Sequence, residues 1–99
     1  MRLSSEQAGI IRQTVEAYFA GPVTVRLFGS RLDDEARGGD IDLLVETSAV
    51  VDRPAFSAAD LAARLERRLG GRRVDVVLVT PFTAEQPIHR LAHEKSVVL

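Results

Sequence analysis

The sequence has no cysteine, and this absence removes several classes of site at once. Without cysteine there is no disulfide scaffold, no zinc–thiolate centre and no thiol nucleophile. Charge of one sign is not in excess either: 13 Lys and Arg stand against 14 Asp and Glu, for a net charge of −1. Because no basic field would recruit a polyanion, we expect no direct binding to nucleic acid.

Long apolar runs are also missing. No run approaches the roughly 20 residues that a membrane-spanning helix needs, and the start, Met-Arg-Leu-Ser-Ser-Glu, lacks the apolar core of a signal peptide. The 99 residues are 45% apolar and 27% charged, an ordinary globular balance. We therefore expect one cytoplasmic domain over residues 1–99, with its own core and no membrane contact.

Aromatic residues are few, and they are scattered along the chain. The five are Tyr18, Phe19, Phe28, Phe56 and Phe82. Such spacing does not make a platform on which bases could stack, so these side chains are predicted to lie in the core.

Apolar spacing and turn residues predict the order of helices and strands. Helices are expected over residues 4–20, 57–69 and 88–94, and strands over 23–28, 40–45, 74–79 and 97–99. Residues 31–39 are polar and end in two glycines, which predicts either a loop or a short helix followed by a turn. Capping-box patterns at Ser4 with Gln7 and at Ser57 with Asp60 place the first two helix starts, with a loop over 46–56. The order predicts an α/β (α+β) fold with a small mixed sheet of about four strands and helices mainly on one face.

Three aspartates in predicted strands form the candidate site. Asp40 and Asp42 are two residues apart in one strand, so their side chains point to the same face. Asp75 lies in the next strand along the chain and joins them if the two strands are neighbours. Carboxylates gathered on one face repel each other unless a cation lies between them. A hard divalent cation such as Mg²⁺ is the natural partner.

Gly29, Ser30 and Arg31 follow the first predicted strand and suit a phosphate group. Glycine lets a phosphate approach the backbone closely, and backbone N–H groups at a helix start bind anions. The Ser30 hydroxyl and the Arg31 guanidinium would add direct contacts. A triphosphate held on one side and bridged by metal on the other is typical of phosphoryl-type transfer.

The stretch Leu27-Phe28-Gly29-Ser30-Arg31, followed by Gly39-Asp40-Ile41-Asp42-Leu43-Leu44-Val45, resembles the signature of the DNA polymerase β-like nucleotidyltransferase superfamily. The whole chain is similar to the minimal nucleotidyltransferases of that superfamily, which carry no appended domain. The resemblance implies metal-dependent transfer of a nucleoside monophosphate from a nucleoside triphosphate to a hydroxyl.

The resemblance also assigns roles. It implies that Gly29 and Ser30 hold the triphosphate, that Asp40 and Asp42 bind two Mg²⁺ (or Mn²⁺) ions, and that Asp75 completes one metal site and helps to deprotonate the acceptor. Many such proteins are antitoxins paired with a HEPN ribonuclease toxin, onto which characterised members transfer AMP. We therefore expect ATP as substrate, a HEPN toxin as partner, and assembly into a homo- or hetero-oligomer.

Each residue of the candidate site also has a plain structural explanation. Ser30 suits a helix N-cap, Asp40 suits a turn after two glycines, and Asp75 suits an exposed strand end. The site requires all three to coincide in the correct order, which favours function over chance. His89 and His93, four residues apart, lack a third ligand and are expected at the surface.

Two further alternatives stay open. The arginines Arg64, Arg67, Arg68, Arg72 and Arg73 either complement the negative end of a helix, which is favoured, or contact a partner. The chain itself is either a transferase or a non-catalytic module of the same fold that neutralises its partner by occlusion. Transfer to a small molecule such as an aminoglycoside ranks last, since relatives with that activity carry a second domain.

Overall fold

Two helices and four strands make up the regular part of the described chain. The computed structural model describes residues 3–28, 41–83, 90 and 94–99. In chain order the elements are α1 (Ser5–Tyr18), β1 (Val23–Phe28), β2 (Ile41–Thr47), α2 (Pro54–Arg68), β3 (Val74–Val79) and β4 (Val97–Val98). Most of the predicted helix over 88–94 lies outside the described residues.

The four strands form one mixed sheet in the order β3-β2-β1-β4. β1 pairs antiparallel with β2 and with β4, whereas β2 and β3 are parallel. Parallel neighbours need a crossover connection, and α2 supplies it. The predicted mixed sheet of about four strands is confirmed.

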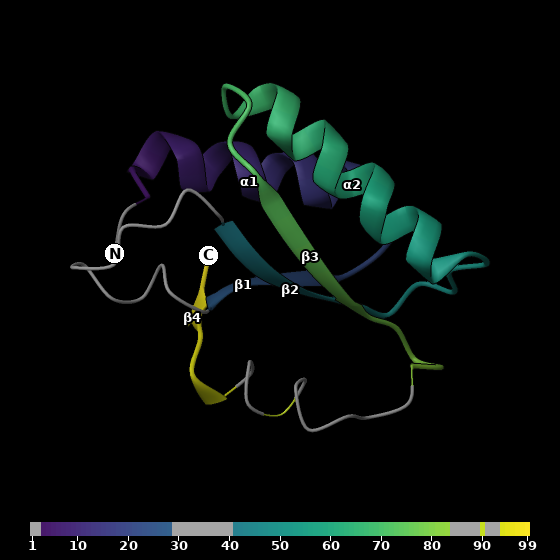
Figure 1. The fold of residues 1–99 in the computed structure, drawn as a ribbon. Helices are drawn as coiled ribbons and strands as arrows, with labels where there is room; N and C mark the ends of the chain where they lie inside the picture. The colour runs from purple at the N-terminus through teal and green to yellow at the C-terminus, as the bar shows by residue number, and fades with distance from the viewer. Residues whose placement is uncertain (1–2, 29–40, 84–89, 91–93) are drawn as a thin grey trace.

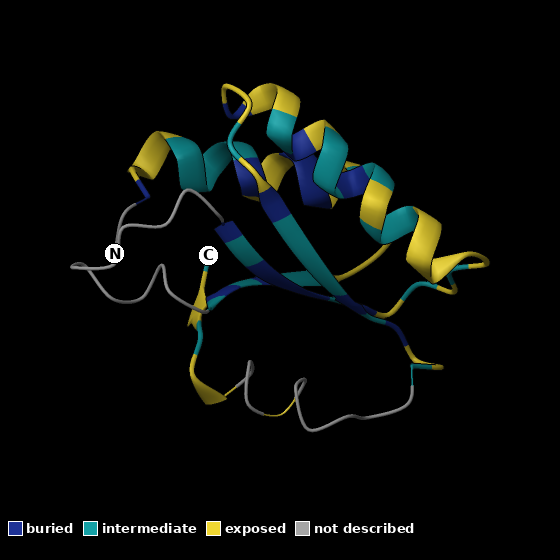
Figure 2. Ribbon diagram, in the orientation of Figure 1, coloured by how far each residue is buried: buried dark blue, intermediate teal, exposed yellow. Residues whose placement is uncertain are grey.

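Both helices cover the same face of this sheet, as Figure 1 shows. The core lies between the two layers, and its buried residues are in ribbon segments coloured dark blue in Figure 2. From the helices it takes Ile11, Val15, Leu61 and Leu65, and from the strands Leu27, Ile41, Leu43 and Val45. Each of these eight residues has 0% exposure.

The start of α1 follows the sequence prediction. The Ser4 hydroxyl accepts a hydrogen bond from the Gln7 N–H at 3.1 Å, and the Gln7 side chain accepts one from the Ser4 N–H at 3.0 Å. This reciprocal capping box satisfies two of the backbone donors that open a helix.

The predicted start of α2 at Ser57 is wrong: the helix begins at Pro54. Proline suits the first helical position, because its φ is already helical and it has no N–H to satisfy. The Ser57 N–H donates to the Arg53 carbonyl at 2.9 Å, so Ser57 already belongs to the first turn.

Two strand predictions also need correction. β2 runs on to Thr47, because Glu46 and Thr47 pair with Thr24 and Val23 of β1. β3 has the predicted bounds. Its run of valine and leucine predicts a strand buried on both faces, but β3 is an edge strand in which only Val74 and Leu78 are buried.

The prediction that the aromatic residues lie in the core fails for two of them. Phe19 is buried, but Phe56 and Phe82 are 56% and 78% exposed. Phe56 lies under the Arg53 guanidinium, which is 4.7 Å from the ring centroid. Neither described helix is long and apolar enough to span a membrane.

Two hydrogen bonds join the helices: the Tyr18 hydroxyl donates to Asp60 at 2.8 Å, and Arg68 donates to the Thr14 hydroxyl at 2.7 Å. Within α2, Arg64 also donates to the Asp60 carboxylate, at 3.3 Å. The hydrogen bond from Tyr18 lowers the pKa of Asp60. Burial, followed by the bond to Asp60, raises the pKa of Tyr18.

Replacing Leu65 with alanine tests the core. Leu65 is fully buried, so Leu65→Ala should lower the free energy of unfolding by about 2–5 kcal/mol in urea denaturation. Val50 is 70% exposed, so Val50→Ala is the control and should change it by less than about 0.5 kcal/mol. Equal losses in the two variants would contradict the described packing.

Replacing Tyr18 with phenylalanine tests the contact between the helices. The pKa of Asp60 is lowered in the folded state. The stabilisation that the ionised Asp60 carboxylate contributes is therefore fully present above its unfolded-state pKa, and it is lost as the pH falls through its folded-state pKa. Tyr18→Phe should lower the free energy of unfolding at pH 7, and its difference from wild type should shrink towards pH 3. A difference that is constant between these pH values would show that the Asp60 carboxylate does not contribute.

Candidate active site on the distal face of the sheet

The distal face is the face of the sheet turned away from α1 and α2. Ile41, Leu43 and Val45 of β2 belong to the core under the helices. Side chains alternate along a strand, so Asp42, Leu44 and Glu46 of β2 point to the distal face. The same alternation on β3 turns Val74 to the helices and Asp75 to the distal face.

The pairing of β2 with β3 brings two of the predicted site residues together. In the parallel register Asp42 lies opposite Asp75, and both side chains are half-buried. Neighbouring strands are about 4.8 Å apart. Like charges this close destabilise a sheet unless an opposite charge compensates them.

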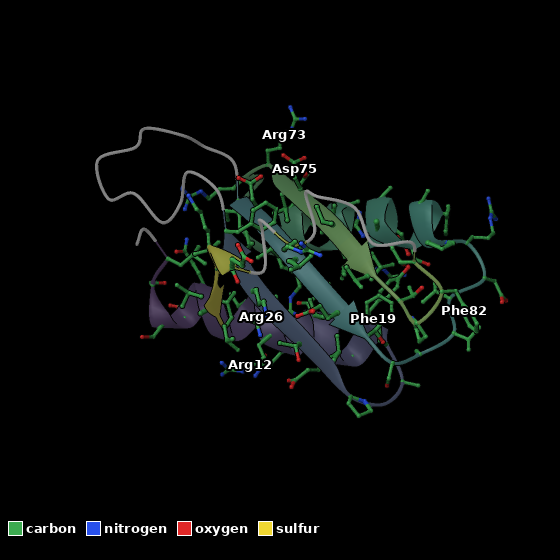
Figure 3. All side chains as sticks on the ribbon, turned by 90° about the horizontal axis from the view of Figure 1, so that it is seen from below. Arg12, Phe19, Arg26, Arg73, Asp75 and Phe82 are labelled. Carbon is green, nitrogen blue, oxygen red and sulfur yellow. The ribbon has the colours of Figure 1, made fainter. Side chains whose placement is uncertain are left out.

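A cation of the chain lies beside this pair. The Nε atom of Arg73 is 3.7 Å from a carboxylate oxygen of Asp75, and the two side chains lie next to each other at the start of β3 in Figure 3. Because 70% of the Arg73 side chain and 48% of the Asp75 side chain are exposed, solvent screens this ion pair. Arg73 therefore offsets part of the charge on Asp75.

Arg73 was predicted to belong with the arginines at the end of a helix, and its ion pair with Asp75 was not predicted. The signal was present, because residues two apart at the start of a strand point to the same face. Arg64 donates to Asp60 of its own helix and Arg68 donates to Thr14 of α1, contacts that neither of the two explanations named.

Four predicted site residues lie outside the described part of the chain: Gly29, Ser30, Arg31 and Asp40. His89 and His93 also lie outside it. The nearest described neighbours of the four site residues are informative: Phe28 pairs with Asp42, and Ile41 pairs with Val74. Within the part of the chain that the structure describes, no three acidic, histidine or cysteine side chains form a metal-binding group.

A second charged pair occupies the distal face farther along β2. Arg26 donates to Glu46 at 2.9 Å, with 21% and 32% of the two side chains exposed. Beyond it, at the end of β2, is a hollow of about 600 Å³ whose lining includes Glu46, Ser48 and Thr80. Four residues of strand, or about 13 Å, separate Glu46 from Asp42, so this hollow is distinct from the carboxylate pair.

A family model, described as a nucleotidyltransferase domain, matches residues 9–98. The chain belongs to this nucleotidyltransferase family. The match covers nearly the whole sequence and confirms the resemblance drawn from the Gly-Ser and Asp-x-Asp motifs. Among curated proteins, none matches this sequence.

Solved structures share the fold. A crystal structure from Shewanella oneidensis has a TM-score of 0.70 at 16% identity, covering 98% of this chain and 71% of the other. A chain in the rebuilt complex of tri-AMPylated Shewanella oneidensis HEPN toxin with MNT antitoxin also has a TM-score of 0.70, at 20% identity, covering 97% of this chain and 71% of the other. These likenesses confirm the nucleotidyltransferase fold.

Proposed function

We propose that this chain, as a single domain, is a metal-dependent nucleotidyltransferase that transfers AMP from ATP to a hydroxyl of a protein partner. The observation that carries the proposal is the opposed pair Asp42 and Asp75 on the distal face of a nucleotidyltransferase domain. Like charges opposite each other in a sheet destabilise it unless an opposite charge compensates them, and a metal ion held by both carboxylates would supply that charge.

The residues of the pair suit a divalent metal. Carboxylate oxygens are the hard donors that Mg²⁺ and Mn²⁺ prefer, and Asp42 and Asp75 offer them from neighbouring strands. Asp40, two residues before Asp42 in the sequence, would be the third ligand. Two bound Mg²⁺ ions would neutralise the phosphate oxygens and make the acceptor hydroxyl a stronger nucleophile.

The nucleotide would bind beside the carboxylates. Gly29 follows Phe28, whose backbone pairs with Asp42, and this adjacency supports Gly29 and Ser30 as the residues that hold the triphosphate. Arg31 would add a charge-assisted contact to the same group.

The transfer is a displacement at the α-phosphorus of ATP. The acceptor oxygen forms the new O–P bond as the bond from the α-phosphorus to the bridging oxygen breaks, and pyrophosphate leaves with that electron pair. Asp75 accepts the hydroxyl proton and then releases it to solvent. Positioning of the triphosphate and the hydroxyl supplies most of the catalysis in this class of reaction.

The partner is proposed to be a HEPN toxin, and the chain its antitoxin. The complex from Shewanella oneidensis contains an MNT antitoxin with a tri-AMPylated HEPN toxin, and this supports the same direction of transfer here. The acceptor hydroxyl would then belong to the HEPN partner.

The proposal is tested by transfer of label from α-³²P-ATP to a candidate HEPN protein with Mg²⁺. Wild type should label the HEPN protein, and Asp42→Ala should reduce the rate at least about a hundredfold, because a metal contributes several kcal/mol to the transition state. The double variant Asp40→Ala with Asp42→Ala should give no label.

Glu46→Gln is the matched control. Glu46 lies on the same strand and the same face as Asp42 but pairs with Arg26, so this variant should label the HEPN protein at the wild-type rate. If neither the wild type nor any variant transfers label with any nucleotide, and the double variant still inhibits the HEPN ribonuclease, the chain acts by occlusion. The catalytic proposal is then wrong.

A further inference from the structure

The start of β3, where Asp75 lies, is bonded to the last turns of α2 through one side chain. Glu66 is half-buried, and one of its carboxylate oxygens accepts a hydrogen bond from the Val74 N–H at 3.0 Å. The Glu66 carbonyl also accepts from the Gly71 N–H at 2.8 Å. Glu66 therefore holds both the turn after α2 and the first residue of β3.

This bond is important because of where Val74 lies. Val74 is 2% exposed, and a buried N–H without an acceptor costs about 1–3 kcal/mol. Gly71 has a positive φ of 86°, so the chain enters β3 from a tight turn. A fixed acceptor at Val74 thus determines where the strand begins.

The same place is joined to β2. The Ile41 N–H donates to the Arg73 carbonyl at 2.9 Å. Ile41 lies between Asp40 and Asp42 in the sequence, and Val74 lies between Arg73 and Asp75. A continuous path of hydrogen bonds and backbone therefore runs from the Glu66 carboxylate to the aspartates of both strands.

We propose that Glu66 is a positioning residue for Asp75: it fixes the start of β3 so that the Asp75 carboxylate stays opposite Asp42. This inference rests on the proposed function, because it takes the two carboxylates to share a metal. Residues that orient metal ligands typically change metal affinity by 10- to 100-fold when they are replaced. A carboxylate is not required at Glu66, since any oxygen acceptor of the same length serves the Val74 N–H.

The test measures binding of Mn²⁺ alone to the full chain, monitored by the electron paramagnetic resonance signal of free Mn²⁺. The Mn²⁺ sites that the Asp75→Asn variant lacks are taken as the candidate site. Glu66→Ala should weaken binding at these sites roughly tenfold. Glu66→Gln keeps an acceptor oxygen and should restore the wild-type affinity.

Tyr18→Phe is the control for general destabilisation, because it weakens the contact between the helices without touching β3. It should leave Mn²⁺ affinity unchanged even though it lowers the melting temperature. If Glu66→Ala does not fold, its effect is read from Glu66→Gln against Glu66→Leu, which keeps the size of the side chain but has no acceptor.

The outcomes separate the two proposals. Wild type that binds no Mn²⁺ at the site overturns the proposed function and this inference with it. Wild-type affinity in Glu66→Ala and Glu66→Leu overturns this inference alone. Glu66→Ala that also weakens the Mn²⁺ sites remaining in Asp75→Asn would show that Glu66 does not act through Asp75.

Discussion

The parallel pairing of β2 with β3 is the constraint on which the candidate site depends. It places Asp42 opposite Asp75, and a slip of one residue would turn Asp75 towards the helices. The core prevents that slip, because Val74 and Leu78 are buried on the helix side of β3. The packing of apolar side chains on one face thereby fixes the position of charged side chains on the other.

Polar groups around this pairing limit its cost. Arg73 lies beside Asp75 and screens part of its charge, while its carbonyl accepts the Ile41 N–H. Glu66 accepts the N–H of Val74 from the opposite layer. A cation held by both carboxylates would compensate their like charges, which destabilise a sheet when they lie opposite each other.

Much of the fold could be predicted from the sequence, because the signals were local. The capping box at Ser4 and the bounds of β3 follow from short-range patterns, and both are confirmed. The start of α2 was misplaced because a capping pattern at Ser57 was preferred to the proline at position 54. The exposure of Phe56 and Phe82 could not be predicted, since it depends on where the surrounding layers end.

The candidate site could be predicted only in part, because local patterns do not determine which strands are neighbours. Strand alternation places Asp42 and Asp75 on one face, but whether their strands are neighbours depends on the topology of the sheet. The family resemblance implied that Asp75 completes a metal site, but it was not used to predict the order of the strands. Strand alternation could have placed Arg73 beside Asp75. The bond from the Val74 N–H to Glu66 could not be predicted, because it arises from the turn that joins α2 to β3.

The most direct test of this account is a crystal structure of the chain with Mn²⁺ and a non-hydrolysable ATP analogue, with the metal located by its anomalous scattering. The account predicts an anomalous peak in direct contact with carboxylate oxygens of both Asp42 and Asp75, bridging to the phosphates of the nucleotide. Metal and nucleotide bound elsewhere, with this carboxylate pair making no contact to either, would contradict it.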